Sequence, residues 1–275
     1  MTELPHNIDA EAALLGALLV DNGVYDRVSD IAGPEHFFDP VHGQIFEIAA
    51  RLIGEGRAAT PITLRTFFEA AAPISDTMTI PQYLGSLAAN AVTTRNAPDY
   101  ARTVRDLATR RQLVGLAEDM ARINRELVEQ THAYQTFSPN QPSNLMFDKP
   151  VDGPLSSPFG LRRFFNGEER NPHSGLDFAV GAGTPIKSPA AGKVILIGNY
   201  FFNGNTVFVD HGQGLISMFC HMSKIDVKLG QSLPRGGIVG RVGSTGRATG
   251  PHMHWNVSLN DTRVDPAIFI GAFKP

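Results

Sequence analysis

The chain has 275 residues, a formal net charge of −3 and 42% hydrophobic residues, a length that allows two domains with a core each. Its single cysteine, Cys220, excludes an internal disulfide and a cysteine-rich zinc framework. No stretch approaches the roughly 20 apolar residues that a membrane helix needs, so no membrane span is expected.

Composition changes near residue 124. Residues 1–124 contain ten arginines, no lysine and sixteen acidic residues, a net charge of −6, whereas residues 125–275 carry +3. Glycine rises from 8 residues in the first segment to 19 in the second. Scarce glycine favours helices and abundant glycine favours turns. We therefore expect a multi-domain α plus β protein, with an all-α N-terminal domain and an antiparallel β-sheet C-terminal domain.

The first predicted helix contains a row of leucines at helical spacing and ends before the turn sequence Asp21–Gly23. The row consists of Leu14, Leu15, Leu18 and Leu19. Acidic rather than basic residues precede it and no small-residue cleavage site follows, so we interpret it as a buried helix face and not a secretion signal. Further helices are predicted over His42–Leu52 and from about Ala97 to Glu126.

Four arginines on the last of these helices raise the question of nucleic-acid binding: Arg102, Arg105, Arg110 and Arg111. Acidic residues alternate with them, which favours a solvated face of ion pairs. The net charge of −6 also argues against a phosphate-binding surface. No direct nucleic-acid binding is expected.

Three segments of this half resemble the N-terminal helical domain of replicative DnaB-type DNA helicases, over about residues 4–122: Pro5–Gly16, Pro34–His42 and Asn96–Ala101. The resemblance implies that the domain associates with itself and contacts a primase-type partner. In that family a separate motor domain hydrolyses ATP. The phosphate-binding pattern G-x-x-x-x-G-K-[ST] does not occur in these 275 residues, so the helicase activity is not carried over.

A proline-rich polar segment, Ser138–Asn144, is predicted to be an extended linker. The expected domains are residues 1–124, a helix end and linker over 125–149, and residues 150–275. In the last part, short apolar runs bounded by glycine and asparagine predict strands. These runs are Lys193–Ile197, Thr206–Val209 and Leu215–Cys220, with hairpin turns at Asn203–Asn205 and Gly212–Gly214.

The pattern H-x-H at His252 and His254 places both imidazoles on one face of a strand, because side chains alternate along a strand. The alternation continues through Asn256 and Ser258, for which two readings stay open. The two residues either contact the site or the substrate, or they are polar strand residues exposed to solvent. A polar concave face with an apolar face behind it is expected.

Three further groups in this half extend the histidine pattern: His173 and Asp177 in H-x-x-x-D, and His221. Five such groups in one glycine-rich domain are the inventory of a zinc hydrolase. Two imidazoles and one carboxylate would hold the ion and leave its fourth tetrahedral position for water or a substrate carbonyl. Zinc lowers the pKa of bound water and polarises a carbonyl, and the remaining histidines would handle protons and stabilise the transition state.

The motifs of residues 150–275 resemble the lysostaphin/LytM-type zinc endopeptidases, which cut peptide cross-links in bacterial cell walls. These motifs are Ser157–Arg162, Pro172–Asp177, Val209–Gly212, His221–Ser223 and Gly246–His254. The resemblance implies that His173, Asp177 and His254 bind zinc, while His221 and His252 are catalytic. Which of the two is the base stays open. His211 lies outside the pattern, and its turn context favours a structural role.

We therefore predict a zinc-dependent endopeptidase on peptidoglycan cross-links, fused to a helical association domain. The alternative is a non-catalytic assembly or partner-binding protein whose peptidase-like domain binds the wall without cutting. The peptidase half implies the cell envelope or periplasm, whereas the helical half and the missing signal peptide imply the cytoplasm. This conflict suggests a chimera, natural or constructed, and leaves the compartment undetermined.

Overall fold

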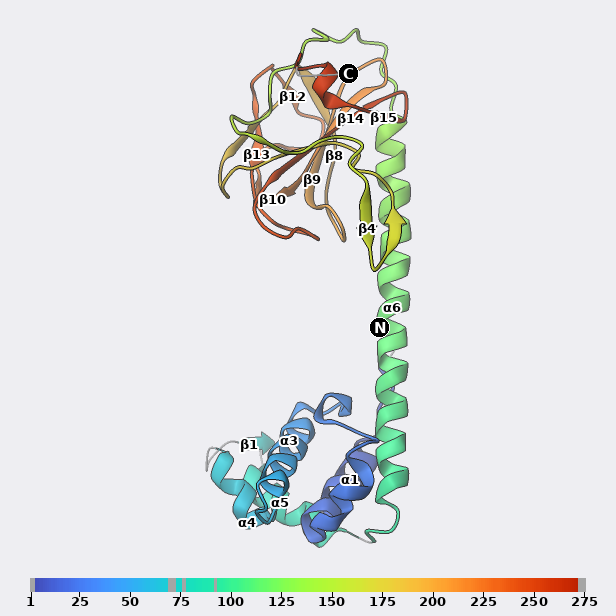
Figure 1. Cartoon of the computed structure of the whole chain (residues 1–275), viewed down its shortest axis with the longest axis vertical. Helices are drawn as coiled ribbons and strands as arrows, with labels where there is room; N and C mark the ends of the chain where they lie inside the picture. Colours follow the sequence, from blue (N-terminus) through green and yellow to red (C-terminus); the bar gives the residue numbers. More distant parts are fainter. Residues whose placement is uncertain (1–2, 69–72, 76–77, 92, 272–275) are drawn as a thin grey trace. The chain divides into compact units, whose positions relative to one another are not determined.

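The computed structural model describes residues 3–68, 73–75, 78–91 and 93–271, so the last residues of the expected C-terminal domain, 272–275, lie outside the described residues. The chain forms two compact units, Met1–Asp119 and Met120–Pro275, here called the helical unit and the β unit (Figure 1). The division falls within one helix, α6 (Ala97–Tyr134). The predicted fold class is confirmed. Among the described residues, no helix combines the length and apolarity that crossing a membrane requires.

The helical unit is built around α1 (Ile8–Val20), α3 (Pro40–Gly54), α5 (Ile80–Ala89) and the start of α6. Each predicted helix is present. Asn7 caps α1 by accepting a hydrogen bond from the backbone N–H of Ala10. The smaller elements are η1 (Asn22–Val24), α2 (Tyr25–Val28), η2 (Pro34–His36), α4 (Pro61–Leu64), η3 (Arg65–Phe67), β1 (Pro73–Ser75) and β2 (Met78–Thr79).

The leucine row of α1 lies inside the core of the helical unit. Leu14, Leu15 and Leu18 are completely buried and Leu19 is 4% exposed, packed in the same cluster as Phe46 of α3. These side chains therefore pack within the core of a single chain. The prediction of a buried helix face is confirmed, and the row leaves little apolar surface for association with another chain.

A buried carboxylate links α1 to the start of α3. Glu11 is 2% exposed and accepts a 2.7 Å hydrogen bond from the backbone N–H of Phe38. It also lies 2.8 Å from Nδ1 of His42, which is fully buried, and the other ring nitrogen of His42 contacts the hydroxyl of Tyr83. Burial raises the pKa of Glu11, but these hydrogen bonds outweigh burial and leave the pKa below its ordinary value.

The arginines of α6 differ in their contacts. Arg102 pairs with Asp99 at 2.6 Å, as expected of a solvated ion-paired face. Arg111 instead donates to the backbone carbonyls of Pro5 and His36, and its guanidinium lies over the ring of Phe38. Arg111 therefore ties loops of the helical unit to α6, so the solvated-face reading is wrong for this residue.

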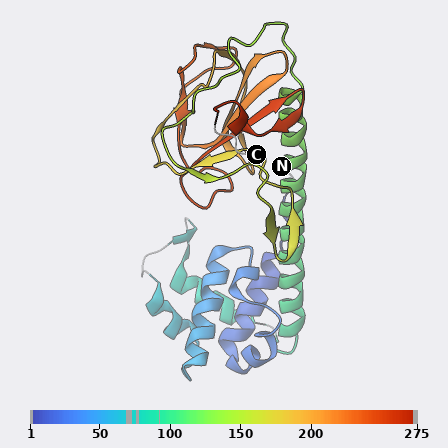
Figure 2. The same ribbon diagram turned by 45° about the horizontal axis from the view of Figure 1, so that its top comes forward.

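The β unit contains an antiparallel sheet in the order β12-β8-β9-β10-β14-β6-β3, with β15 also paired to β14 (Figure 2). Its strands are β3 (Leu155–Ser157), β6 (Leu176–Phe178), β8 (Gly192–Tyr200), β9 (Gly204–Gly212), β10 (Leu215–Met222), β12 (Ser232–Leu233), β14 (Met253–Leu259) and β15 (Thr262–Val264). The other elements are β4 (Arg163–Phe165), β5 (Glu168–Arg170), β7 (Pro185–Lys187), β11 (Lys224–Ile225), β13 (Ile238–Arg241) and η4 (Pro266–Ile268).

The segment that contains the predicted linker, residues 135–149, contacts the rest of the β unit near both of its ends. Helix α6 continues to Tyr134 instead of ending near Glu126, and Tyr134 is 3% exposed against Phe208. The carbonyl of Ser138 accepts from the N–H of Gln213, and Phe147 is buried in the core. The boundaries expected at residues 124 and 150 stay predictions, and the compact units divide at Asp119.

Candidate active site

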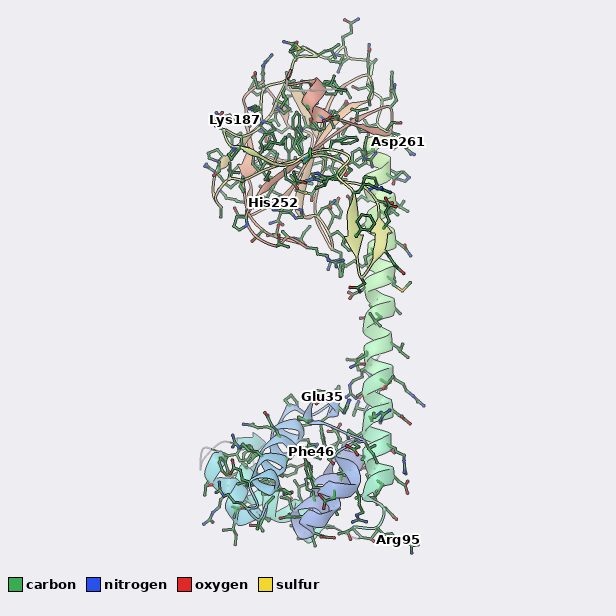
Figure 3. The ribbon with its side chains drawn as sticks, in the orientation of Figure 1. Glu35, Phe46, Arg95, Lys187, His252 and Asp261 are labelled. Atoms are coloured by element: carbon green, nitrogen blue, oxygen red, sulfur yellow. The ribbon has the colours of Figure 1, made fainter. Side chains whose placement is uncertain are left out.

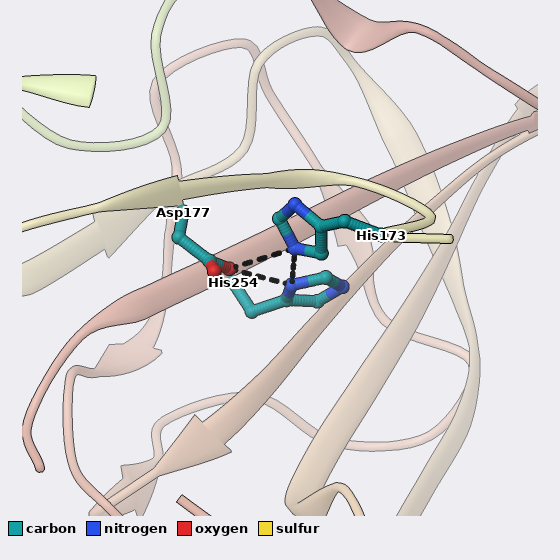
Figure 4. A group of neighbouring side chains, drawn as sticks. All are labelled: His173, Asp177 and His254. Atoms are coloured by element: carbon teal, nitrogen blue, oxygen red, sulfur yellow. Dashed lines mark hydrogen bonds and ion pairs between the residues drawn. The ribbon is translucent and has the colours of Figure 1, made fainter. Parts of the chain in front are cut away.

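Three of the predicted site residues converge between neighbouring strands. Asp177 of β6 lies directly opposite His254 of β14 in the sheet register, and His173 precedes β6. Figure 4 shows the three side chains pointing toward one another. The Nε2 atom of His173 lies 3.1 Å from Oδ1 of Asp177, and Nδ1 of His254 lies 2.7 Å from the same oxygen. The two ring nitrogens are 3.1 Å apart, so the three atoms could hold one metal ion.

The ring of His173 is fixed by a backbone group. Its Nδ1 lies 2.8 Å from the carbonyl oxygen of Pro158, which can only accept, so Nδ1 carries the hydrogen. The lone pair of neutral His173 is therefore on Nε2, the atom that faces Asp177 and His254. A ligating histidine is commonly oriented in this way by a partner on its other ring nitrogen.

Gly175 provides the space for His254. A Cβ atom at this position would lie 2.3 Å from the carbonyl oxygen of Trp255 and 3.0 Å from the ring of His254. Any side chain there would displace the strand or the ring. The glycine inside H-x-x-x-D therefore has a steric role that its position in the motif does not reveal.

His221 and His252 lie beside this cluster. Their ring centroids are 4.9 Å apart, and Nε2 of His252 is 4.0 Å from Oδ1 of Asp177. Figure 3 labels His252 within the β unit. The Nδ1 atoms donate to the carbonyls of Thr245 and Gly250, each at 2.9 Å. In the neutral rings the lone pair is therefore on Nε2, where each can accept a proton.

The backbone at His221 is unusual. The residue has φ of 57°, in the left-handed region, and it lies where the pairing of β9 with β10 shifts register between Phe219 and Met222. A β-bulge redirects a side chain and is common beside active sites. The bulge turns His221 toward His252 and away from the alternation of its strand.

Burial and hydrogen bonding set the charges of the cluster. Burial raises the pKa of Asp177, but the imidazoles of His173 and His254 beside it outweigh burial and hold the pKa well below its usual range. Burial lowers the pKa values of His221 and His254. A carboxylate that stays ionised beside neutral imidazoles is the protonation state that metal ligands require.

The strand of the H-x-H motif does not present a continuous open polar face. Met253, Trp255 and Val257 are buried on the core side as predicted, but Asn256 is only 1% exposed. Asn256 donates to the carbonyl of Ser174, 2.8 Å away, and Ser258 is fully buried. The solvated reading of Asn256 and Ser258 is therefore wrong. Asn256 supports the residue next to His173.

Sequence reasoning missed the backbone groups that orient the rings. The carbonyls of Pro158, Thr245 and Gly250 belong to the motifs Ser157–Arg162 and Gly246–His254 or lie beside them, but no side-chain pattern marks them. His211 is buried and bonded to the carbonyl of Ala191 and the hydroxyl of Ser217. These contacts agree with a structural role.

The β unit combines an antiparallel sheet with a His–Asp–His cluster whose geometry suits a metal site. Comparison with known families agrees with this description. Residues 171–266 match the model of peptidase family M23. Residues 3–106 match the model of the DnaB-like helicase N-terminal domain. These two matches confirm both resemblances, one for each part of the chain.

Individual relatives agree with this division. Peptidoglycan DD-endopeptidase ShyA of Vibrio cholerae is 41% identical over 119 residues, 42% of this chain and 28% of the relative. Replicative DNA helicase DnaB of Rickettsia typhi is 36% identical over 117 residues, 42% of this chain and 23% of the relative. This chain thus spans about a quarter of the length of either relative.

A solved structure also matches. It is a crystal structure of a Pseudomonas aeruginosa protein described as a peptidase of family M23, with 78% sequence identity and a TM-score of 0.52. The match covers 57% of this chain and 64% of that chain.

Proposed function

We propose that the β unit is a zinc-dependent endopeptidase that hydrolyses peptide bonds in peptidoglycan cross-links. The observation that carries the proposal is the convergence of His173, Asp177 and His254 on one point, with His221 and His252 beside it. The M23 match and the endopeptidase relative support the reaction class. Such a substrate would place the activity at the cell envelope.

The donor set fits zinc. Two imidazole nitrogens and one carboxylate oxygen make three ligands, which leaves a fourth tetrahedral position for substrate. The hydrogen bond from His173 to the carbonyl of Pro158 directs its Nε2 to the ion position. Bound zinc supplies a Lewis acid for the scissile carbonyl.

The two remaining histidines would move protons. His221 and His252 each hold Nδ1–H against a backbone carbonyl, so each can take a proton at Nε2 and return it to the leaving amine. In its protonated form either ring could donate to the developing oxyanion. The geometry gives both rings the same tautomer, so their roles must be separated by kinetics.

Elemental analysis and turnover on purified sacculi test the proposal. We expect one zinc ion per chain, and Asp177→Ala should lower the zinc content. His221→Ala and His252→Ala should keep zinc while hydrolysis falls by about 10² or more, the scale of losing a proton-transfer group. Zinc binding with no turnover by the unaltered protein would instead favour the non-catalytic wall-binding alternative.

We further propose that the helical unit serves association, on the support of its DnaB-like match. Contact with a primase-type partner rests on this resemblance alone. Since the leucine row of α1 is buried, other surfaces must mediate association. Sedimentation of the full chain across a concentration series tests this proposal, and a monomer at high micromolar concentration would contradict it.

A further inference from the structure

The last turns of α6 contact a loop that holds His221. This loop, Phe201–Asn203, joins β8 to β9, and the carbonyl of Asn203 accepts a 2.8 Å hydrogen bond from the backbone N–H of His221. The bond is made at the residue with a left-handed backbone, where the regular β9–β10 pairing is interrupted. The loop therefore accepts a hydrogen bond that the regular β9–β10 pairing does not provide at the bulge.

Two side chains of α6 hold this loop. Glu126 accepts a 2.7 Å hydrogen bond from the backbone N–H of Phe201, and its other oxygen accepts from Arg122. Gln130 accepts a 2.8 Å hydrogen bond from the side-chain amide of Asn203. Glu126 and Gln130 are four residues apart and so lie on one face of the helix. The side chain of Glu126 is only 13% exposed, which strengthens a charge-assisted bond.

The same loop also contacts the segment that orients the His221 ring. The carbonyl of Phe202 accepts from the N–H of Arg247, and a Cβ atom at Gly246 would lie 2.6 Å from that carbonyl oxygen. Thr245, the preceding residue, provides the carbonyl that fixes the ring of His221. One short loop thus contacts both the backbone of His221 and the segment that sets its tautomer.

We propose that Glu126 and Gln130 of α6 are positioning residues for His221, acting through the loop Phe201–Asn203. This inference rests on the proposed endopeptidase function of the same site. It makes the end of α6 a working part of the peptidase, although both residues lie outside the segment 171–266 matched by the M23 family model. His173 and His254 bond instead to Pro158, to Asp177 and to each other.

The test compares Gln130→Ala and Glu126→Ala with their conservative counterparts Gln130→Glu and Glu126→Gln, all in the full chain. The conservative variants keep an oxygen that can accept the loop hydrogen bond. Alanine is the best helix former, so the alanine variants do not lower the helix propensity of α6. Asn124→Ala, at an exposed position on the same helix, is the matched control.

We expect the alanine variants to lower kcat on a soluble cross-linked muropeptide by about tenfold, the scale for losing an orienting contact, with KM and zinc content largely unchanged. The conservative variants and Asn124→Ala should retain most of the kcat. A kcat equal to that of the unaltered protein in both alanine variants would overturn the inference. So would equal losses in the alanine and conservative variants.

A second measurement separates this inference from the proposed function. Long-range ¹H–¹⁵N spectra report the tautomer and mobility of a histidine ring, and His221→Ala identifies the signal of His221. We expect that signal to shift or broaden in Gln130→Ala but not in Gln130→Glu or Asn124→Ala. If the unaltered protein does not cut muropeptides, the proposed function fails and the spectra alone decide the inference, which an unchanged signal in Gln130→Ala would overturn.

Discussion

Both units bury a carboxylate against histidine, but the two clusters differ in their balance of donors and acceptors. In the helical unit, Glu11 receives hydrogen bonds from the backbone of Phe38 and Asp39 as well as from His42. In the β unit, Nδ1 of His173 donates its hydrogen to the carbonyl of Pro158. The lone pair on Nε2 therefore faces an oxygen of Asp177. A bound cation would suit this second arrangement, whereas backbone and side-chain donors stabilise the carboxylate of Glu11 in the first.

The comparison shows that residue types alone do not separate a structural ion pair from a metal centre. Glu11 and His42 form a pair as well buried as any in the β unit. The deciding observation is which nitrogen of each histidine ring carries the hydrogen. N–H groups that point at a carboxylate stabilise it, as at Glu11. A ring lone pair that points at a carboxylate, as at His173, is stabilised by a positive charge between them.

The largest expected difference comes from deleting each carboxylate. Glu11→Ala leaves buried His42 and two backbone N–H groups without their acceptor, and breaking a buried pair in this way costs about 3–5 kcal/mol. Urea unfolding of the helical unit should show this loss, while Glu47→Ala at an exposed position of α3 should not. Asp177→Ala should lower the metal content of the β unit and leave the unfolding of the helical unit unchanged. Equal unfolding of Glu11→Ala and the unaltered protein would contradict the structural role.

The Glu11 cluster also predicts a direction of pH dependence. Because the pKa of Glu11 in the folded state lies below its unfolded value, its contribution to stability is fully present above the ordinary pKa of a glutamate. That contribution is lost as pH falls through the folded pKa. Unfolding of the helical unit measured between neutral and acidic pH should therefore show a loss of stability at the acidic end that is absent in Glu11→Ala.

Metal removal should affect the two units differently. A ligand that binds only the folded state stabilises it by about 2.7 kcal/mol at a concentration 100 times its Kd. Chelation should therefore lower the unfolding temperature of the β unit and leave that of the helical unit unchanged. Calorimetry with and without added zinc measures both transitions, and a chelator shift confined to the helical unit would reverse the assignment.

A pair of glycines provides a matched steric test. Gly175→Ala would push against the ring of His254 and the carbonyl of Trp255, and we expect zinc affinity to fall by about 10–100-fold, the scale of a disturbed ligand environment. Gly16→Ala would meet the carbonyl of Leu87 at 2.4 Å and should destabilise the helical unit without changing zinc affinity. Zinc titration and thermal unfolding of both variants check the contrast.

Local patterns predicted much of this molecule. The leucine row identified α1, and the H-x-H alternation placed His252 and His254 beside Asp177. Local patterns could not predict which distant residues pack against each helix or strand. The polar face of β14 was expected to be open, but Asn256 is buried because Ser174 and the hydroxyl of Tyr134 contact it.

The length of α6 was underestimated for a related reason. Its last turns are stabilised by contacts with the β unit, such as Tyr134 against Phe208, and a helical pattern within the segment does not report them. The bulge at His221 depends likewise on a loop that is distant in sequence. Long-range packing therefore decided the features that local periodicity missed.

The smallest expected effects concern two tyrosines, the buried Tyr134 of the β unit and the partly buried Tyr83 of the helical unit. Burial raises the pKa of Tyr134, so it stays neutral, and its hydroxyl donates to Asn256 across a long 3.4 Å contact. Tyr134→Phe keeps the ring packed on Phe208 and should cost at most about 1 kcal/mol of β-unit stability. Tyr83→Phe removes the partner of a fully buried ring nitrogen of His42, so a cost of about 1–3 kcal/mol is expected for the helical unit. Urea unfolding of the two variants measures both costs, and a larger loss for Tyr134→Phe would show that the β unit depends on this hydroxyl more than its geometry indicates.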